Sequence, residues 1–133
     1  ARVVQEATDD SGREMTAEEL YGLFRAEYLD AGAGRRWRVG DDRAEVDGRE
    51  GTGAGPLDAV ADAVGAEILS FSEHAVGSGR DAVAYVEARV GGPDGRVVWG
   101  VGRDASVLTA GVRAVLSAVG RAARGATVPV RKA

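Results

Sequence analysis

The segment Gly51–Val60 (Gly-Thr-Gly-Ala-Gly-Pro-Leu-Asp-Ala-Val) constrains the fold more than any other part of the chain. Its three alternating glycines leave one side of a strand end bare, so that another backbone or a small molecule can approach closely. Pro56 then suits the first turn of a helix. The pattern predicts a strand, a bare loop and a helix N-terminus, where carboxylates and phosphates often bind. It also fits a glycine-rich turn that only permits tight strand–helix packing, and this segment alone does not separate the two.

Composition narrows the possible functions. The 133 residues suffice for one domain with a sizeable core, and the formal net charge of −4 gives no reason to expect nucleic acid as a partner. The chain has no Cys and a single His, His74, so neither a metal site nor a cofactor is expected. No apolar run is long enough to span a membrane and no signal segment opens the chain, which makes the cytosol the expected compartment. The first residue is Ala1 rather than Met, as in a fragment or a processed chain.

The N-terminal part predicts a short strand and one helix. Residues 2–8 read as a strand or extended arm. Thr16 and Glu19 have the spacing of a capping box, and an apolar stripe follows up to about Asp30, before the breaker at 31–34.

The rest of the chain alternates strand and helix patterns. In order, these are a hairpin at 35–50 turning at 40–42, a helix at 56–64 ended by Gly65, a strand at 66–76 with a possible bulge, strands at 82–90 and 96–102, a long helix with Asp104 as its N-cap, and a tail at 126–133.

An internal repeat links these elements. Gly51-Thr52-Gly53 precedes one apolar helix and Gly100-Val101-Gly102 precedes the other, each after a set of short strands. The chain therefore predicts an α+β fold of two stacked strand–strand–(strand)–helix units. Pairing two such units, or two chains, is the natural way to cover their apolar faces.

Candidate chemistry is sparse. Glu73 and His74 could form an acid–base pair, but neighbours on a strand point to opposite faces, which favours a structural histidine. One face of strand 82–90 carries alanines at 82, 84 and 88. Such small side chains leave room for close helix packing or for a small apolar ligand, and packing is the more common reason.

Three segments resemble the signatures of one family, the C-terminal regulatory domain of 2-isopropylmalate synthases. The first is Gly51–Ala59, which is similar to the family's G-x-G-x-G-P-hydrophobic-x-A motif. The others are Ser72-Glu73-His74-Ala75 with Asp81–Glu87, and Trp99-Gly100-Val101-Gly102 with the helix that contains Thr109 and Arg121. The resemblance covers nearly the whole chain in the family's order.

The resemblance implies two βββα units related by a pseudo-twofold axis, in a domain that forms a homodimer and binds L-leucine or a similar branched-chain amino acid. Related citramalate synthases sense isoleucine. The implied division is a lead-in at 1–34, the regulatory domain at 35–125 and a tail at 126–133. The parent enzyme would be an acyltransferase with a separate TIM-barrel catalytic domain, which needs about 250 residues and cannot be present in this chain.

The resemblance also implies a leucine pocket and no catalytic residue. The implied ligand-binding residues are Gly53, Gly55, Leu57, Asp58, Ile68, Phe71, Ala75, Ala82, Ala84 and Val107. The ligand carboxylate would face the N-terminus of the Pro56 helix, and the isobutyl group would enter the space beside the small strand residues. Asp58 departs from the family pattern, which often has a small residue there; it places a negative charge near the carboxylate site and could instead face the ammonium group.

Two alternatives remain open. The domain could stand alone as an enzyme or binder for another small molecule, in which case Glu73, His74 and Asp58 are the ionisable residues to test. It could also be a dimerisation module whose pocket has closed.

Overall fold

The computed structural model describes residues 16–77 and 79–125. The described chain begins with helix α2 (Ala17–Phe24), which continues into one π-helical turn, η1 (Arg25–Leu29). The predicted capping box is confirmed, because the Thr16 hydroxyl accepts from the Glu19 N–H and the Glu19 carboxylate accepts from the Thr16 N–H. We call residues 16–34 the lead-in. The strand predicted at 2–8 and the tail predicted at 126–133 lie outside the described residues.

Three short antiparallel strands and a helix follow the lead-in. Sheet A consists of β1 (Trp37–Val39), β2 (Arg43–Val46) and β3 (Arg49–Thr52) in that order, and helix α3 (Pro56–Ala63) comes next. The hairpin predicted at 35–50 with its turn at 40–42 is confirmed as β1 and β2, but the residue pattern missed the third strand, β3. Asp47 and Gly48 both have positive φ, +50° and +84°, and turn the chain within that segment to create β3.

The second half repeats this order with longer strands. Sheet B consists of β4 (Ala66–Val76), β5 (Asp81–Val90) and β6 (Arg96–Asp104), followed by helix α4 (Val107–Ala123). The predicted bulge in β4 is confirmed between Ile68 and Ser70. The prediction of Asp104 as N-cap was wrong: β6 extends through Asp104, and Ser106 caps α4 by accepting from the Thr109 N–H.

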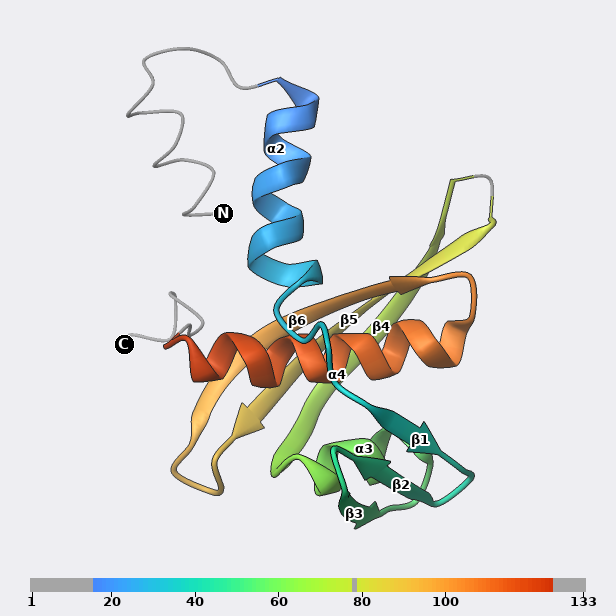
Figure 1. The fold of residues 1–133 in the computed structure, drawn as a ribbon, viewed down its shortest axis with the longest axis vertical. Coiled ribbons are helices and arrows are strands. Elements are labelled where there is room, and N and C mark those ends of the chain that lie inside the picture. Colours follow the sequence, from blue (N-terminus) through green and yellow to red (C-terminus); the bar gives the residue numbers. More distant parts are fainter. Residues whose placement is uncertain (1–15, 78, 126–133) are drawn as a thin grey trace.

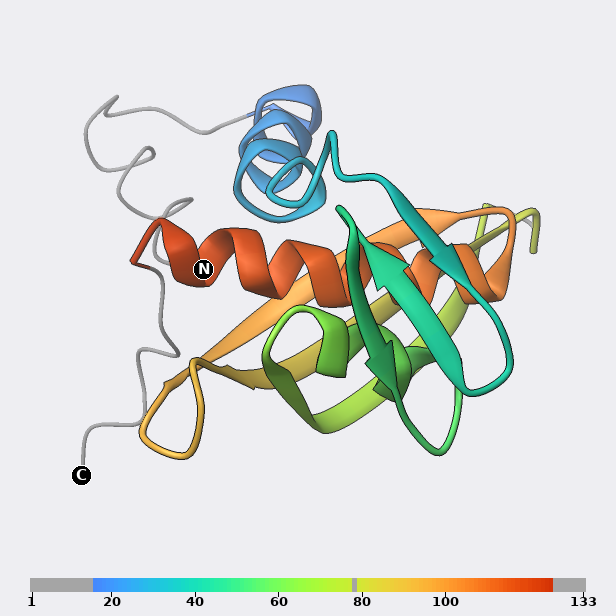
Figure 2. The same cartoon turned by 60° about the horizontal axis from the view of Figure 1, so that its bottom comes forward.

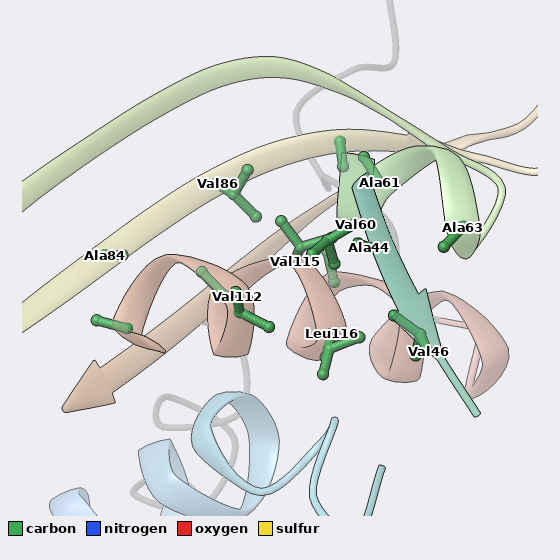
Figure 3. Packing of buried hydrophobic residues seen from close by; sticks show 14 of the residues in the cluster. Ala44, Val46, Val60, Ala61, Ala63, Ala84, Val86, Val112, Val115 and Leu116 are labelled. Carbon is green, nitrogen blue, oxygen red and sulfur yellow. The ribbon is translucent and has the colours of Figure 1, made fainter. Parts of the chain in front are cut away.

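The two βββα units form layers with the helices between the sheets (Figures 1 and 2). Helix α3 packs on β2 and β3, α4 packs on β5 and β6, and the two helices contact each other. Side chains from both sheets and both helices form one core, including Val46, Val60, Val86 and Val115 (Figure 3). The predicted α+β class with two repeated units is therefore confirmed.

The repeated glycines explain how each helix lies so close to its sheet. A Cβ on Gly51 would lie 2.3 Å from the Ala59 carbonyl oxygen and 2.4 Å from the Ala63 nitrogen. A Cβ on Gly100 would lie 2.1 Å from the Ala114 carbonyl oxygen and 2.4 Å from the Ala118 nitrogen. The two units therefore repeat the same backbone contact. In each unit the glycine lies against the C=O of one alanine of the helix and the N–H of the alanine four residues later.

The lead-in packs against α4 by the same device. A Cβ on Gly32 would lie 2.5 Å from the Leu116 carbonyl carbon, and one on Gly120 would lie 1.9 Å from the Ala31 carbonyl oxygen. The end of the lead-in and the middle of α4 are therefore in backbone contact. Within the described ranges, no helix is long and apolar enough to cross a membrane.

Candidate functional site: an apolar ledge beside two helix N-termini

The most exposed apolar surface of sheet B lies along β4. Helix α4 covers β5 and β6 but only a small part of β4, so the inner side of β4 beyond its bulge stays open. Phe71 is 40% exposed there, and Ala75 is exposed two pleats further on. The first turn of α4 adds Val107, 54% exposed, and Leu108, 40% exposed. We call Phe71, Ala75, Val107 and Leu108 the ledge.

Strand register places Ala75 at the end of sheet B where α4 begins, whereas Phe71 is paired with Val86 in the middle of the sheet. Ala75 is paired with Ala82, and Ala82 is paired with Asp104, three residues before α4 begins. The row that contains Ala75 therefore crosses the sheet to the start of α4. The ledge joins one side of β4 to the first turn of α4.

Two helix N-termini open toward this end of the domain. Leu57, in the first turn of α3, lies against Gly111, in the second turn of α4, and a Cβ on Gly111 would be 2.9 Å from Leu57 Cδ1. Figure 1 shows that the two helices run in broadly the same direction. Their positive dipole ends thus lie on the same side as the ledge.

The two N-termini differ in how they are capped. Ser106 satisfies one N–H of α4 with its own hydroxyl. Helix α3 starts from Gly55, which is extended, with φ −153° and ψ −179°, and gives no side-chain cap. The first-turn N–H groups of α3 are therefore better placed to receive an external carboxylate.

The structure gathers part of the predicted ligand set around the ledge. Gly55 and Asp58 lie at the open N-terminus of α3, where Asp58 is exposed and a Cβ on Gly55 would meet no atom within 4 Å. Leu57 and Ile68 are half-buried and pack against the core, but Ile68 is paired with Ala88 toward the other end of sheet B. Phe71, Ala75 and Val107 belong to the ledge itself.

Three predicted residues are instead covered by helices. A Cβ on Gly53 would lie 2.6 Å from Asp58 Cβ and 2.7 Å from the Ala59 nitrogen, so α3 occupies its open side. Ala82 is 8% exposed and Ala84 is fully buried. Each of these positions allows close helix packing, one of the two explanations that the sequence left open.

The ionisable residues considered for an enzyme do not form a cluster. Glu73 is paired with Ala84 on the inner side of sheet B, whereas His74 is paired with Val83 on the outer side. The His74 ring meets the Tyr85 ring edge-on, with centroids 5.9 Å apart. In the described ranges, no group of three or more His, Cys, Asp or Glu residues could hold a metal ion.

A polar groove lies on the β6 side of the same end of sheet B. A groove of about 620 Å³ runs between the lead-in and the β6–α4 end of the domain. Two ion pairs lie within it: Arg103 Nε donates to Asp81 Oδ2 at 3.0 Å, and Arg113 lies 3.0 Å from Asp104. Asp81 raises the pKa of Arg103, chiefly through this hydrogen bond. The groove contains none of the predicted ligand residues, so it is not the site that the resemblance implies.

Sequence reasoning missed a polar stripe on α4. The stripe consists of Arg113, Ser117 and Arg121, each four residues from the next, and all three form hydrogen bonds with the outer edge of β6. Arg113 Nη1 donates to the Arg103 carbonyl at 2.9 Å, and Ser117 Oγ accepts from the Val101 N–H at 3.1 Å. Arg121 Nη1 donates to the Trp99 carbonyl at 2.5 Å. The four-residue spacing on an otherwise apolar helix was the signal for this stripe.

The same stripe holds the lead-in. Ser117 Oγ donates to the Tyr28 carbonyl at 2.5 Å, and Arg121 Nε donates to the Glu27 carboxylate at 2.9 Å. The Arg121 guanidinium also lies 4.2 Å from the centre of the Tyr28 ring. One helix therefore connects the edge of sheet B to the π-helical turn of the lead-in.

Comparison with known proteins agrees with this architecture. Residues 37–123 match the model of the LeuA allosteric (dimerisation) domain. The chain is 42% identical over 141 residues to a 2-isopropylmalate synthase of Cupriavidus taiwanensis, covering 91% of this chain and 24% of that protein. It is 39% identical over 153 residues to a 2-isopropylmalate synthase of Kineococcus radiotolerans, covering 93% and 26%.

The chain spans about a quarter of the length of these curated relatives and corresponds to their C-terminal region. The family match extends over both βββα units, from the first residue of β1 to the last residue of α4. The chain therefore belongs to the LeuA allosteric (dimerisation) domain family.

Proposed function

We propose that this domain binds L-leucine at the ledge and, as a homodimer, regulates a 2-isopropylmalate synthase by feedback. The observation that carries the proposal is the exposed ledge beside the uncapped N-terminus of α3. A branched-chain amino acid has the matching halves, an apolar side chain and a carboxylate. No residue of this domain is assigned a catalytic role.

The chemistry of the site supports this class of ligand. Free N–H groups in the first turn of α3 favour a carboxylate, and the exposed carboxyl group of Asp58 in that turn suits an ammonium group. Phe71 and Val107 offer apolar contact for a side chain of four carbons. Burying such a side chain contributes about 2 kcal/mol.

A second copy of the domain would complete the pocket. The ledge is open to solvent on one chain, whereas ligand sites bury most of their ligand. A partner placed over the ledge would enclose the amino acid, so that ligand binding and dimerisation would stabilise each other.

Regulation requires a catalytic partner beyond this chain. Since the relatives are about four times as long and are 2-isopropylmalate synthases, we assign the acyl transfer to a TIM-barrel domain in the rest of the parent enzyme. Leucine would then change the activity of that domain through a coupling free energy of about 1–3 kcal/mol.

Thermal unfolding with leucine, isoleucine, valine or no ligand tests the binding step. A ligand at about 100 times its dissociation constant should stabilise the fold by about 2.7 kcal/mol. For a domain of this length that corresponds to a rise in Tm of about 10 °C. We expect the largest rise with leucine, and a Tm unchanged by all three amino acids would refute the proposal.

A matched pair of variants locates the site. Val107→Asp places a carboxylate on the ledge at the first position of α4, where the helix dipole tolerates it, and should abolish the rise in Tm with leucine. Thr109→Asp places the same charge in the same helical turn but off the ledge and should retain the rise. Equal responses of the two variants would show that leucine binds elsewhere.

A further inference from the structure

The two edges of sheet B differ in whether helix side chains form hydrogen bonds with them. The outer edge of β6 is closed by the side chains of Arg113, Ser117 and Arg121. The opposite edge is β4, the first strand in the order β4-β5-β6. Among the described residues, no helix side chain bonds this edge, and most of β4 is exposed.

This open edge is long, and beyond the bulge near its start it has neither proline nor a lysine or arginine to hinder pairing. β4 has 11 residues, Ala66–Val76, without proline. Between its bulge and its end it carries two serines, one Glu and one His, and no lysine or arginine. An exposed edge strand of this kind presents a row of N–H and C=O groups that can bond another strand.

We propose that two copies of this chain associate through β4, which pairs antiparallel with β4 of the second copy to form one continuous six-stranded sheet. This inference rests on the homodimer in the proposed function and specifies the surface that forms it. The occupant is a second copy because the matched family is a dimerisation domain, and because an isologous contact pairs a surface with itself.

Charge restricts the register of this pairing. A twofold axis at Glu73 would place that carboxylate against its own copy, and an axis at Ser70 would place Glu67 near Glu73 of the second copy. An axis close to Ser72 avoids both contacts and sets Ser70 opposite His74 of the second copy. Backbone hydrogen bonds would then hold the two strands about 4.8 Å apart.

The same pairing brings the ledges of the two copies together. Phe71 and Ala75 lie on the inner side of β4, the side on which α4 packs. A twofold axis perpendicular to the sheet keeps both inner sides on one face, so the two ledges become neighbours across β4. The ledge of each copy is then flanked by the second copy rather than by solvent.

Cysteine cross-linking tests the pairing directly, because the chain contains no Cys of its own. Residues opposite each other on antiparallel strands have Cα atoms about 4.5–5.5 Å apart, within the range that a disulfide spans. The test uses three single variants, Ser70→Cys, Ser72→Cys and His74→Cys. Each purified variant is oxidised mildly and analysed on a gel without reductant. Light scattering of the reduced samples gives the mass of the particles in solution. Arg38→Cys, on edge strand β1 of sheet A, is the matched control.

We expect particles of two copies in reducing buffer and a covalent dimer that is strongest for Ser72→Cys. Arg38→Cys should remain monomeric on non-reducing gels. Pairing through β4 would be refuted if the chain is a dimer but none of the β4 cysteines forms a cross-link. It would also be refuted if Arg38→Cys gives the most covalent dimer. That result would leave leucine binding intact, because the thermal shift measures it separately. A chain that stays monomeric with and without leucine refutes the homodimer and the β4 pairing together.

Discussion

The backbone contact at Gly100 gives the sharpest test of the packing. Gly100→Ala adds one methyl group where a Cβ would lie 2.1 Å from the Ala114 carbonyl oxygen. An ordinary contact begins near 3.4 Å, so β6 and α4 must separate by about 1.3 Å. No rotamer change relieves this clash, because backbone atoms make it on both sides.

The separation disturbs the whole core, since α4 contributes residues such as Val112 and Val115 to it. Overpacking of this kind costs about 3 kcal/mol, the upper end of the usual range. For a domain of this length, we expect Tm to fall by about 12 °C. Calorimetry or far-ultraviolet circular dichroism measures the change.

Gly22→Ala is the matched control. Gly22 lies in α2, and a Cβ there would meet no atom within 4 Å. Its replacement should raise helix propensity and stabilise the chain by up to about 1 kcal/mol. If Gly100→Ala melts within about 2 °C of the parent chain, the close contact between α4 and β6 is refuted.

Three further changes test other parts of the structure. Ser117→Ala leaves the Val101 N–H without its side-chain acceptor and should cost about 1–3 kcal/mol in urea unfolding, with faster amide exchange at Val101; unchanged exchange would contradict the edge contact. Thr16→Ala removes the capping box and should cost about 1 kcal/mol, seen as faster exchange confined to the first turn of α2; a uniform change across the domain would argue against a local cap. The pKa of Asp47 is lowered from its ordinary value of 3.8, first by the Arg36 backbone N–H and then by the Arg35 guanidinium. Its stabilisation is therefore present above that value and lost as pH falls through the lowered pKa, so the stability difference between the parent chain and Asp47→Asn should shrink below about pH 4; a difference constant down to pH 2 would contradict this.

Local patterns predicted much of the fold. The capping box of Thr16, the C-capping Gly65 and the alternation of strand 82–90 depend on neighbouring residues, and the structure confirms all three. The turn at Asp47-Gly48 was missed, although Asp-Gly is a strong hairpin signal. Charged residues on both sides of that turn obscured the alternation of β2 and β3.

The candidate site was less predictable, because its exposure depends on which strand each helix covers. In the sequence, Ala75 and Ala84 are alike: each is a small residue of a predicted strand and each belongs to the ligand set that the resemblance implies. The structure buries Ala84 beneath α4 and leaves Ala75 open on β4, a difference set by the path of α4 across the sheet. The role of Ser117 was hidden for a related reason, since its two bonding partners lie 16 and 89 residues away.

The contacts between α4 and the lead-in also bear on where this domain can be shortened. The repeat begins at Trp37, yet a polypeptide cut there would lose the Tyr28 carbonyl that accepts from Ser117 and the Glu27 carboxylate that pairs with Arg121. Ser117 is fully buried and Arg121 is 7% exposed in the intact chain. Removing the lead-in would therefore uncover a guanidinium and a hydroxyl that hold the edge of β6. We therefore expect the stable folding unit to start upstream of the first repeat, so that a chain cut at Trp37 unfolds at a lower temperature than one that keeps the lead-in.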